Sequence, residues 1–156
     1  MKKVIATVAF VMMGIIAYAI NDGAKVEQQN KKTPSGEVIA MNKTLFVDHV
    51  FDYQQKATEW KYKGTKPAII DLYADWCGPC RQTAPIMKEL AKEYAGKIIV
   101  YKVNVDKEKE LATLFNATSI PLFVYIPMNG EPQLMRGSAD KATFKKAIDE
   151  FLLKKE

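Results

Sequence analysis

The stretch Ile69-Ile-Asp-Leu-Tyr-Ala-Asp-Trp-Cys-Gly-Pro-Cys-Arg81 decides the fold, because a buried strand leads directly into a helix within it. Residues 68–74 are almost continuously apolar, which is typical of a strand that is covered on both faces. Asp71 interrupts this apolar run. Burying an unpaired ionisable group costs several kcal/mol, so Asp71 is a candidate functional residue.

The two cysteines that follow this strand are predicted to lie at the start of a helix. Pro79 suits the first helical turn, where its missing N–H is not needed. Cys77 then faces free backbone N–H groups and the positive end of the helix dipole, and both favour a thiolate. We therefore predict that Cys77 is a nucleophile. Cys80, expected to be less exposed, is placed to attack a mixed disulfide formed at Cys77.

Three other roles of a Cys-x-x-Cys pair fit less well. A disulfide across two intervening residues closes a very small loop, which constrains the unfolded chain little. A zinc site needs four ligands, whereas the chain offers only these cysteines and His49 as sulfur or imidazole ligands. Haem attachment requires a histidine after the second cysteine, where Arg81 stands. The pair is therefore predicted to be redox-active, and no metal is expected.

The spacing of apolar residues predicts strands and helices in the order β-α-β-α-β-α-β-β-α. The strands are expected at residues 38–41, 68–74, 98–105, 121–126 and 133–136. The helices are expected to begin near Thr44, at the cysteine pair, and at Asp106 and Asp140, each aspartate serving as an N-cap. This order predicts an α/β fold, in which helices flank both faces of a mixed central sheet.

Individual residues add detail to this outline. His49 falls on the apolar stripe of the first helix and is expected to be a packed or partly exposed residue, not a catalytic one. Leu114 is expected to point inward from the third helix. Asn129-Gly130 is a strong signal for a short hairpin. Pro121 begins a strand and can form a cis peptide bond with Ile120.

The N-terminal segment predicts export from the cytoplasm. Residues 1–19 combine two lysines, an apolar stretch and Ala17-Tyr18-Ala19, a pattern typical of a signal peptide that is cleaved after Ala19. The apolar run over residues 4–20 is also at the lower limit of a membrane span, so a retained anchor is the alternative. The domain is thus expected to be periplasmic, or to be anchored to the inner membrane facing the periplasm.

The rest of the chain divides into a linker and one domain. Residues 20–37 are polar and carry glycine, proline and serine, which predicts a flexible linker or tether. Residues 38–156 are expected to form a single domain. The net charge of +5 is modest and is spread over mixed lysine and glutamate segments. No basic stripe with interleaved aromatic residues is evident, so no nucleic-acid partner is expected.

The motif Trp76-Cys-Gly-Pro-Cys80, with Asp71 in the strand before it and Ile120-Pro121 far downstream, closely resembles the thioredoxin family. The resemblance extends over Val38 to Lys155 and implies the thioredoxin fold. It also implies a monomeric thiol–disulfide oxidoreductase that acts on protein disulfide or dithiol substrates. In such a protein the Cys77–Cys80 pair itself is the redox centre, and no separate cofactor is required.

The resemblance also implies roles for residues outside the cysteine pair. Asp71 aligns with the buried aspartate of thioredoxins, and Lys102 aligns with the lysine that neighbours it. Burial raises the pKa of such a carboxyl, so Asp71 is expected to accept the proton of Cys80. The alternative is a structural Asp71 that pairs with Lys102 and moves no proton. The implied substrate groove comprises Trp76, Gly78, Pro79, Ile120, Pro121 and Gly137.

Two positions depart from the family pattern. Leu122 follows the proline where many thioredoxins carry threonine, and Arg136 precedes Gly137 where a small apolar residue is common. Both departures are expected to affect the choice of partner and not the chemistry.

The direction of electron flow stays open at this stage. Gly78-Pro79 resembles the dipeptide of reducing thioredoxins, which favours a reductase fed by a membrane electron-donor protein. An oxidising compartment favours a disulfide donor, which would pass electrons to a membrane acceptor. A binding module without turnover is a third possibility, but it predicts a lost cysteine or a replaced Asp71, and neither is seen.

Overall fold

The computed structural model describes residues 36–55 and 59–154. The expected signal segment, residues 1–19, and nearly all of the expected linker lie outside these ranges. The described elements are β1 (Val38–Ala40), α1 (Lys43–His49), β2 (Ala68–Tyr73), α2 (Gly78–Glu93), β3 (Ile99–Asn104), α3 (Lys109–Leu114), β4 (Leu122–Ile126), β5 (Gln133–Arg136), α4 (Lys141–Ala147) and the π-helix η1 (Ile148–Leu152).

The strands form one mixed sheet in the order β1-β3-β2-β4-β5. The strands β1, β3 and β2 run parallel, whereas β4 pairs antiparallel with both β2 and β5. The strand that carries Asp71 is therefore central, and β5 is an edge as predicted. The register places Asp71 directly opposite Lys102 of β3.

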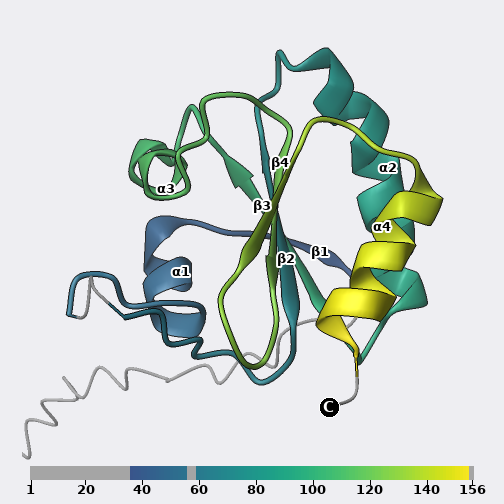
Figure 1. Cartoon of the computed structure of the whole chain (residues 1–156). Coiled ribbons are helices and arrows are strands. Elements are labelled where there is room, and N and C mark those ends of the chain that lie inside the picture. The colour runs from purple at the N-terminus through teal and green to yellow at the C-terminus, as the bar shows by residue number, and fades with distance from the viewer. Residues whose placement is uncertain (1–35, 56–58, 155–156) are drawn as a thin grey trace, which may run out of the picture. The chain divides into compact units, whose positions relative to one another are not determined.

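Helices cover both faces of this sheet, as Figure 1 shows: α1 and α3 lie on one face, and α2 and α4 lie on the other. The core under α1 and α3 contains Phe46, Ile70 and Val124. The core under α2 and α4 contains Ile69, Leu90 and Phe144. Successive residues of β2 alternate between the two cores, as the two-residue period of a strand requires. The predicted α/β fold with helices on both faces is confirmed.

Two of the predictions for helix ends and faces are wrong. Asp140 does cap α4 and accepts from Thr143 N at 2.8 Å. Asp106, however, does not cap α3, which begins after Glu108 without a side-chain cap. Asp106 instead binds a tryptophan at the site. Leu114 is 39% exposed and does not point inward, whereas Leu111 and Phe115, which are four residues apart, are buried.

One further expectation is met in one of its two forms, and another needs refinement. His49, expected to be packed or partly exposed, is the last residue of α1 and is exposed. The Asn129-Gly130 signal does mark a hairpin between β4 and β5, but residues 127–132 separate the two strands, so the loop is longer than a two-residue turn. Gly130 occupies the left-handed region at φ 89°, which explains a glycine here.

None of the helices in residues 36–55 and 59–154 is both long and apolar enough to cross a bilayer. The apolar run over residues 4–20, which is the alternative membrane anchor, lies outside these ranges.

Candidate active site

The junction of β2 and α2 places the two cysteines at the N-terminus of a 16-residue helix. Cys77 is the N-cap of α2, and its Sγ accepts from Cys80 N at 3.2 Å. Pro79 lies in the first turn, as the sequence predicted. The backbone donor that a capping side chain usually satisfies is therefore directed at the sulfur of Cys77.

The two cysteines form a disulfide, with 2.02 Å between the sulfurs and 5.3 Å between the Cα atoms. Both residues are 3% exposed, so the expectation that Cys80 is the less exposed of the two is wrong for the disulfide form. The reason is that both pack in one small cluster with Ala74, against which Tyr73 and Ile120 lie. Exposure does not distinguish the two sulfurs in this form, whereas the capping position does.

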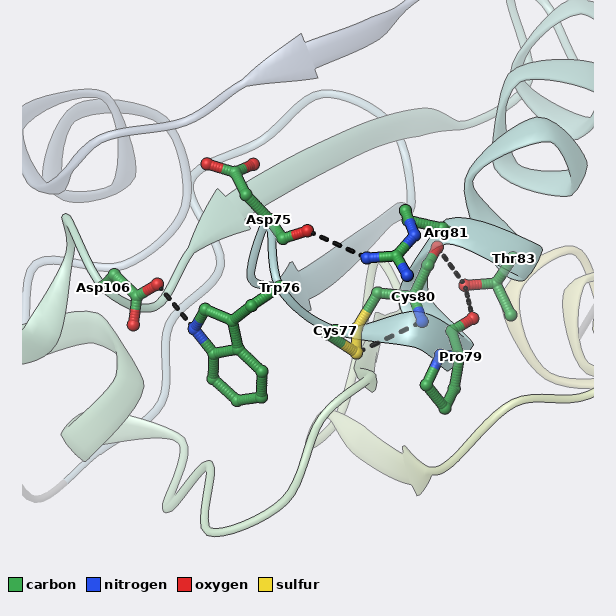
Figure 2. The surroundings of a disulfide bond; sticks show 8 residues. All are labelled: Asp75, Trp76, Cys77, Pro79, Cys80, Arg81, Thr83 and Asp106. Carbon is green, nitrogen blue, oxygen red and sulfur yellow. Dashed lines mark hydrogen bonds between the residues drawn. A yellow bond between two sulfur atoms is a disulfide. The ribbon is translucent and has the colours of Figure 1, made fainter.

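Trp76 lies beside the disulfide and is 68% exposed (Figure 2). Its indole Nε1 donates to Asp106 Oδ2 at 2.9 Å. Asp106 is held in turn, because its backbone N donates to Asn104 Oδ1 at 2.9 Å. The amide of Asn104 also donates to Asp75 Oδ2 at 3.3 Å. This chain of hydrogen bonds fixes the orientation of a large aromatic side chain at the surface next to the sulfurs.

Sequence reasoning missed this role of Asp106 because the pattern also fits a helix cap. The role of Asp106 can be inferred from the order and direction of the strands. The strands β2 and β3 are parallel neighbours, so the residues after their ends meet at one edge of the sheet. Val105 N donates to Tyr73 O at 2.9 Å and fixes that meeting. An acidic residue just after β3 can therefore reach an indole just after β2.

The first turn of α2 has further support from Arg81 and Thr83. Arg81 Nη1 donates to Asp75 O at 3.2 Å, which ties the helix start to the loop before it (Figure 2). The hydroxyl of Thr83 is buried and donates to Cys80 O at 3.1 Å. Neither contact was predicted, since both depend on how the loop folds back on the helix.

Asp71 lies in β2 on the face that α2 covers and is only 5% exposed. Its Oδ1 is enclosed and has no hydrogen-bond partner within the described residues. Burial raises the pKa of Asp71 to about 7, and the charge of Lys102 opposes the rise only in part. A carboxyl with this pKa exchanges protons near neutral pH.

Lys102 faces Asp71 across the strands but forms no salt bridge with it. The salt bridges of the described ranges join Lys43 to Glu110, and Lys141 and Lys145 to glutamates of α2. Lys102 Nζ lies instead 5.8 Å from the centroid of the Tyr73 ring. A direct ion pair, which the structural alternative for Asp71 requires, is not formed. The proton-transfer role stays a prediction.

The expected groove residues are brought together in part. The Ile120-Pro121 bond is cis, and Ile120 packs against the cysteine cluster. Gly137 N donates to Pro121 O at 2.9 Å, so Gly137 lies beside the proline, and its φ of 84° favours glycine. Arg136 turns toward the loop before Ile120, where its Nη2 donates to Asn116 O at 3.1 Å.

Metal ligands do not gather in the part of the chain that the structure describes: no group of three or more histidine, cysteine or acidic side chains could hold an ion there. Cys77 and Cys80 are the sulfur groups of the site, and Asp71 is the ionisable side chain that lines the same pocket as Cys80.

Comparisons with known proteins agree with this geometry. Residues 47–150 match the model of the family described as Thioredoxin. The chain is 39% identical over 113 residues to the Thioredoxin of Borreliella burgdorferi, which covers 72% of this chain and 96% of that protein. It is 38% identical over 94 residues to the chloroplastic Thioredoxin M-type of Spinacia oleracea, which covers 60% of this chain and 52% of that one.

A solved structure shows the same fold. The N21Q mutant thioredoxin from Halobacterium salinarum NRC-1 superimposes with a TM-score of 0.60 at 23% sequence identity. The match covers 76% of this chain and 93% of that chain. At this identity the likeness concerns the fold alone, and it agrees with the sheet order and layers described above.

Proposed function

The chain belongs to the thioredoxin family and is a thiol–disulfide oxidoreductase, and we propose that it reduces disulfides of protein substrates outside the cytoplasm. The observation that carries the proposal is the position of Cys77, which caps a long helix and receives the N–H of Cys80 on its sulfur. A sulfur in this position is stabilised as a thiolate when the disulfide is reduced.

The proposed reaction has two exchange steps. The Cys77 thiolate attacks one sulfur of a substrate disulfide, which forms a mixed disulfide and releases one substrate thiolate. Cys80 then loses its proton to Asp71, and its thiolate attacks Cys77 Sγ. This closes the Cys77–Cys80 disulfide and releases the second substrate thiolate. The substrate gains two electrons, the enzyme loses two, and a dithiol donor restores the reduced form.

Asp71 suits the second step because it lines the same pocket as Cys80. Its pKa of about 7 lets it take up a proton and return it to solvent without a large change in pH. Trp76, Gly78 and Pro79 surround Cys77, and Ile120 lies against the cysteine cluster. We propose that these residues, with Pro121 and Gly137, bind an extended substrate segment next to Cys77.

Reduction is the proposed direction because, apart from the helix N-terminus itself, no charged side chain in the sequence between the two cysteines stabilises the Cys77 thiolate. Gly78 and Pro79 carry no charge, and the nearest cation in the sequence, Arg81, donates to a backbone oxygen. A strong oxidant requires a strongly stabilised reduced form. In the periplasm, or at the inner membrane if residues 4–20 are retained, a membrane protein would have to supply the electrons.

The activity is tested by the reduction of insulin disulfides with dithiothreitol as the electron donor. We expect acceleration by the wild-type chain and none by Cys77→Ser, which keeps the fold but lacks the attacking sulfur. The direction is tested by acid quenching of intact cells, followed by alkylation. A reduced pool that becomes oxidised when the membrane electron supply is blocked supports a reductase. A pool that stays oxidised whatever the supply contradicts it and supports the alternative, a disulfide donor.

A further inference from the structure

A pocket of about 400 Å³ lies behind the disulfide, on the face of the sheet that α2 covers. Its walls come from the start of the domain, from β1, β2 and β3, and from one side of α2. Its lining includes Asp71, Cys80, Met87, Lys88, Lys92 and Lys102. Neither Trp76 nor Ile120 belongs to this lining, so the pocket is distinct from the proposed substrate groove. Its volume is within the range of small-molecule sites.

The mouth of the pocket carries an excess of positive charge. Lys88 and Lys92 are four residues apart on α2, so they project from the same side of the helix, and both are exposed. Lys102 is partly buried on β3. The salt bridges of the described residues use other lysines, so these three lack a carboxylate partner there. Among the described lining residues, Glu37 and Asp71 oppose the three lysines, and only Glu37 is not buried, which suits the exposed part of the pocket to an anion.

The interior of the pocket is apolar except at Asp71. Val38, Met87 and the ring of Tyr73 contribute hydrocarbon surface. Asp71 lines the pocket although it is nearly fully buried, and its enclosed Oδ1 has no hydrogen-bond partner within the described residues. A buried carboxyl with few partners is costly, so a group that binds the accessible part of this carboxyl gains more there than at an exposed position.

We propose that this pocket binds a small organic anion that has an apolar body and, at its far end, a hydroxyl group. The anionic group would meet the exposed Lys88 and Lys92 at the mouth, and the body would lie on the apolar wall. The hydroxyl would reach Asp71. A hydroxyl suits this position because it can donate to a carboxylate and accept from a carboxylic acid, so it serves either protonation state. The reverse orientation would place an anion against Asp71 and is disfavoured.

Occupancy would also affect catalysis. An occupant would separate Asp71 from solvent on this side and so hinder the return of its proton. This consequence rests on the function proposed above, whereas binding does not. Binding is therefore the property to test, with the full chain in its disulfide form.

Three probes test the anionic group, the apolar body and the hydroxyl separately. Binding is measured by calorimetry and by amide chemical shifts of residues around Met87. The probe 4-hydroxyphenylacetate has a carboxylate, an apolar ring and a hydroxyl. Phenylacetate lacks the hydroxyl and should bind about tenfold more weakly, because a hydrogen bond to a charged or buried acceptor is lost. Tyramine has the same ring and hydroxyl with a cationic end, and it should not bind.

Matched variants test the role of the lysines. Lys88→Glu reverses a charge at the mouth and should weaken binding of 4-hydroxyphenylacetate about tenfold. Lys97→Glu makes the same change in net charge at an exposed lysine outside the lining and should change binding less than about twofold. No binding of any probe, equal binding of all three, or equal losses in the two variants would overturn the proposal. Retained insulin reduction alongside any of these results would leave the proposed function intact.

Discussion

The two faces of the sheet are covered in the same way, by two helices each, yet only one of them carries reactive groups. Under α1 and α3 the core is continuous and apolar, and Phe46 packs edge-on against Phe115 with ring centroids 5.5 Å apart. Under α2 and α4 the core is also well filled around Phe144, but beside Cys80 it gives way to Asp71 and to a pocket that extends along α2 as far as Lys92.

This difference shows where close apolar packing is replaced by a carboxyl and a pocket beside the reactive cysteines. A charge or a pocket inside a core reduces stability, because apolar contacts are lost and a polar atom is left without solvent. Asp71 and the pocket both adjoin Cys80, where the reaction needs a proton acceptor and room for the cysteines to react. Among the described residues, the core under α1 and α3 contains no buried carboxyl; its buried polar atom without a partner is Nε1 of Trp60, an uncharged indole N–H.

The largest effect is expected from Cys80→Ser, on the reactive face. The variant should lose turnover and accumulate substrates that are covalently bound to Cys77, since no second sulfur can release them. Non-reducing gels with insulin as the substrate would show the adducts. Cys77→Ser is the matched control and should form none. Adducts that form in Cys77→Ser and not in Cys80→Ser would reverse the two roles.

The next largest effect concerns the closed face and measures its packing. Phe46 is fully buried, so Phe46→Ala should lower the free energy of unfolding by about 3–5 kcal/mol. Met87→Ala, on the pocket side, should cost about 2 kcal/mol, at the low end for such changes, because Met87 already borders an open space. Urea unfolding of the disulfide forms gives both values. An equal or larger loss in Met87→Ala would contradict the contrast between the faces.

A third prediction separates catalysis from stability at Asp71. Asp71→Asn should slow the release of the mixed disulfide, because it removes the proton acceptor. It should also make the chain more stable above about pH 7, since an amide avoids the cost of burying a carboxylate. Because the folded-state pKa of Asp71 is raised to about 7, the folded wild type binds more protons than the unfolded chain, and its stability falls as pH rises toward 7. The gain in the variant should therefore shrink as pH falls.

Asp140→Asn is the control for this pH dependence. Hydrogen bonds from Thr143 hold the pKa of Asp140 below its usual range, so its contribution to stability is present at neutral pH and is lost in acid. The two variants should thus change the pH profile of unfolding in opposite directions. Turnover of Asp71→Asn that matches wild type from about pH 6 to 8 would mean that Asp71 is not the proton acceptor.

The smallest effect is expected at the surface beside the sulfurs. Asp106→Ala removes the acceptor of the Trp76 indole and should change stability by less than about 0.5 kcal/mol, because Trp76 is largely exposed. It should raise the KM for a protein substrate and shift the indole N–H resonance of Trp76. Asp106→Asn keeps an acceptor oxygen and should change both less. An unchanged resonance in Asp106→Ala would show that the contact does not form in solution.

The sequence predicts most of this fold because local patterns and the global arrangement agree. The apolar run of β2, the proline in the first turn of α2 and the cap at Asp140 each identify their element without tertiary information. The position of the cysteine pair at the start of α2 could also be predicted, because the local pattern of the strand and Pro79 specifies it. Asp71 stood out because a carboxyl in a buried strand violates the apolar pattern.

What the sequence could not predict depends on contacts between distant segments. Asp106 fits a helix cap locally and became a partner of Trp76 only because β2 and β3 end at the same edge. The nearly equal exposure of Cys77 and Cys80 follows from packing against Ile120, far along the chain. The pocket requires Glu37 and Lys88, which are distant in the sequence, to line one cavity, and no local pattern specifies this.

The central claim is that the N-terminus of α2 makes the two sulfurs unequal, and brief alkylation tests it most directly. The full chain is reduced, treated for a short time with iodoacetamide near neutral pH, and mapped by peptide mass spectrometry. We expect label on Cys77 well before Cys80, because the N–H groups at the helix start stabilise its thiolate. Preferential labelling of Cys80, or equal labelling of both, would contradict the claim.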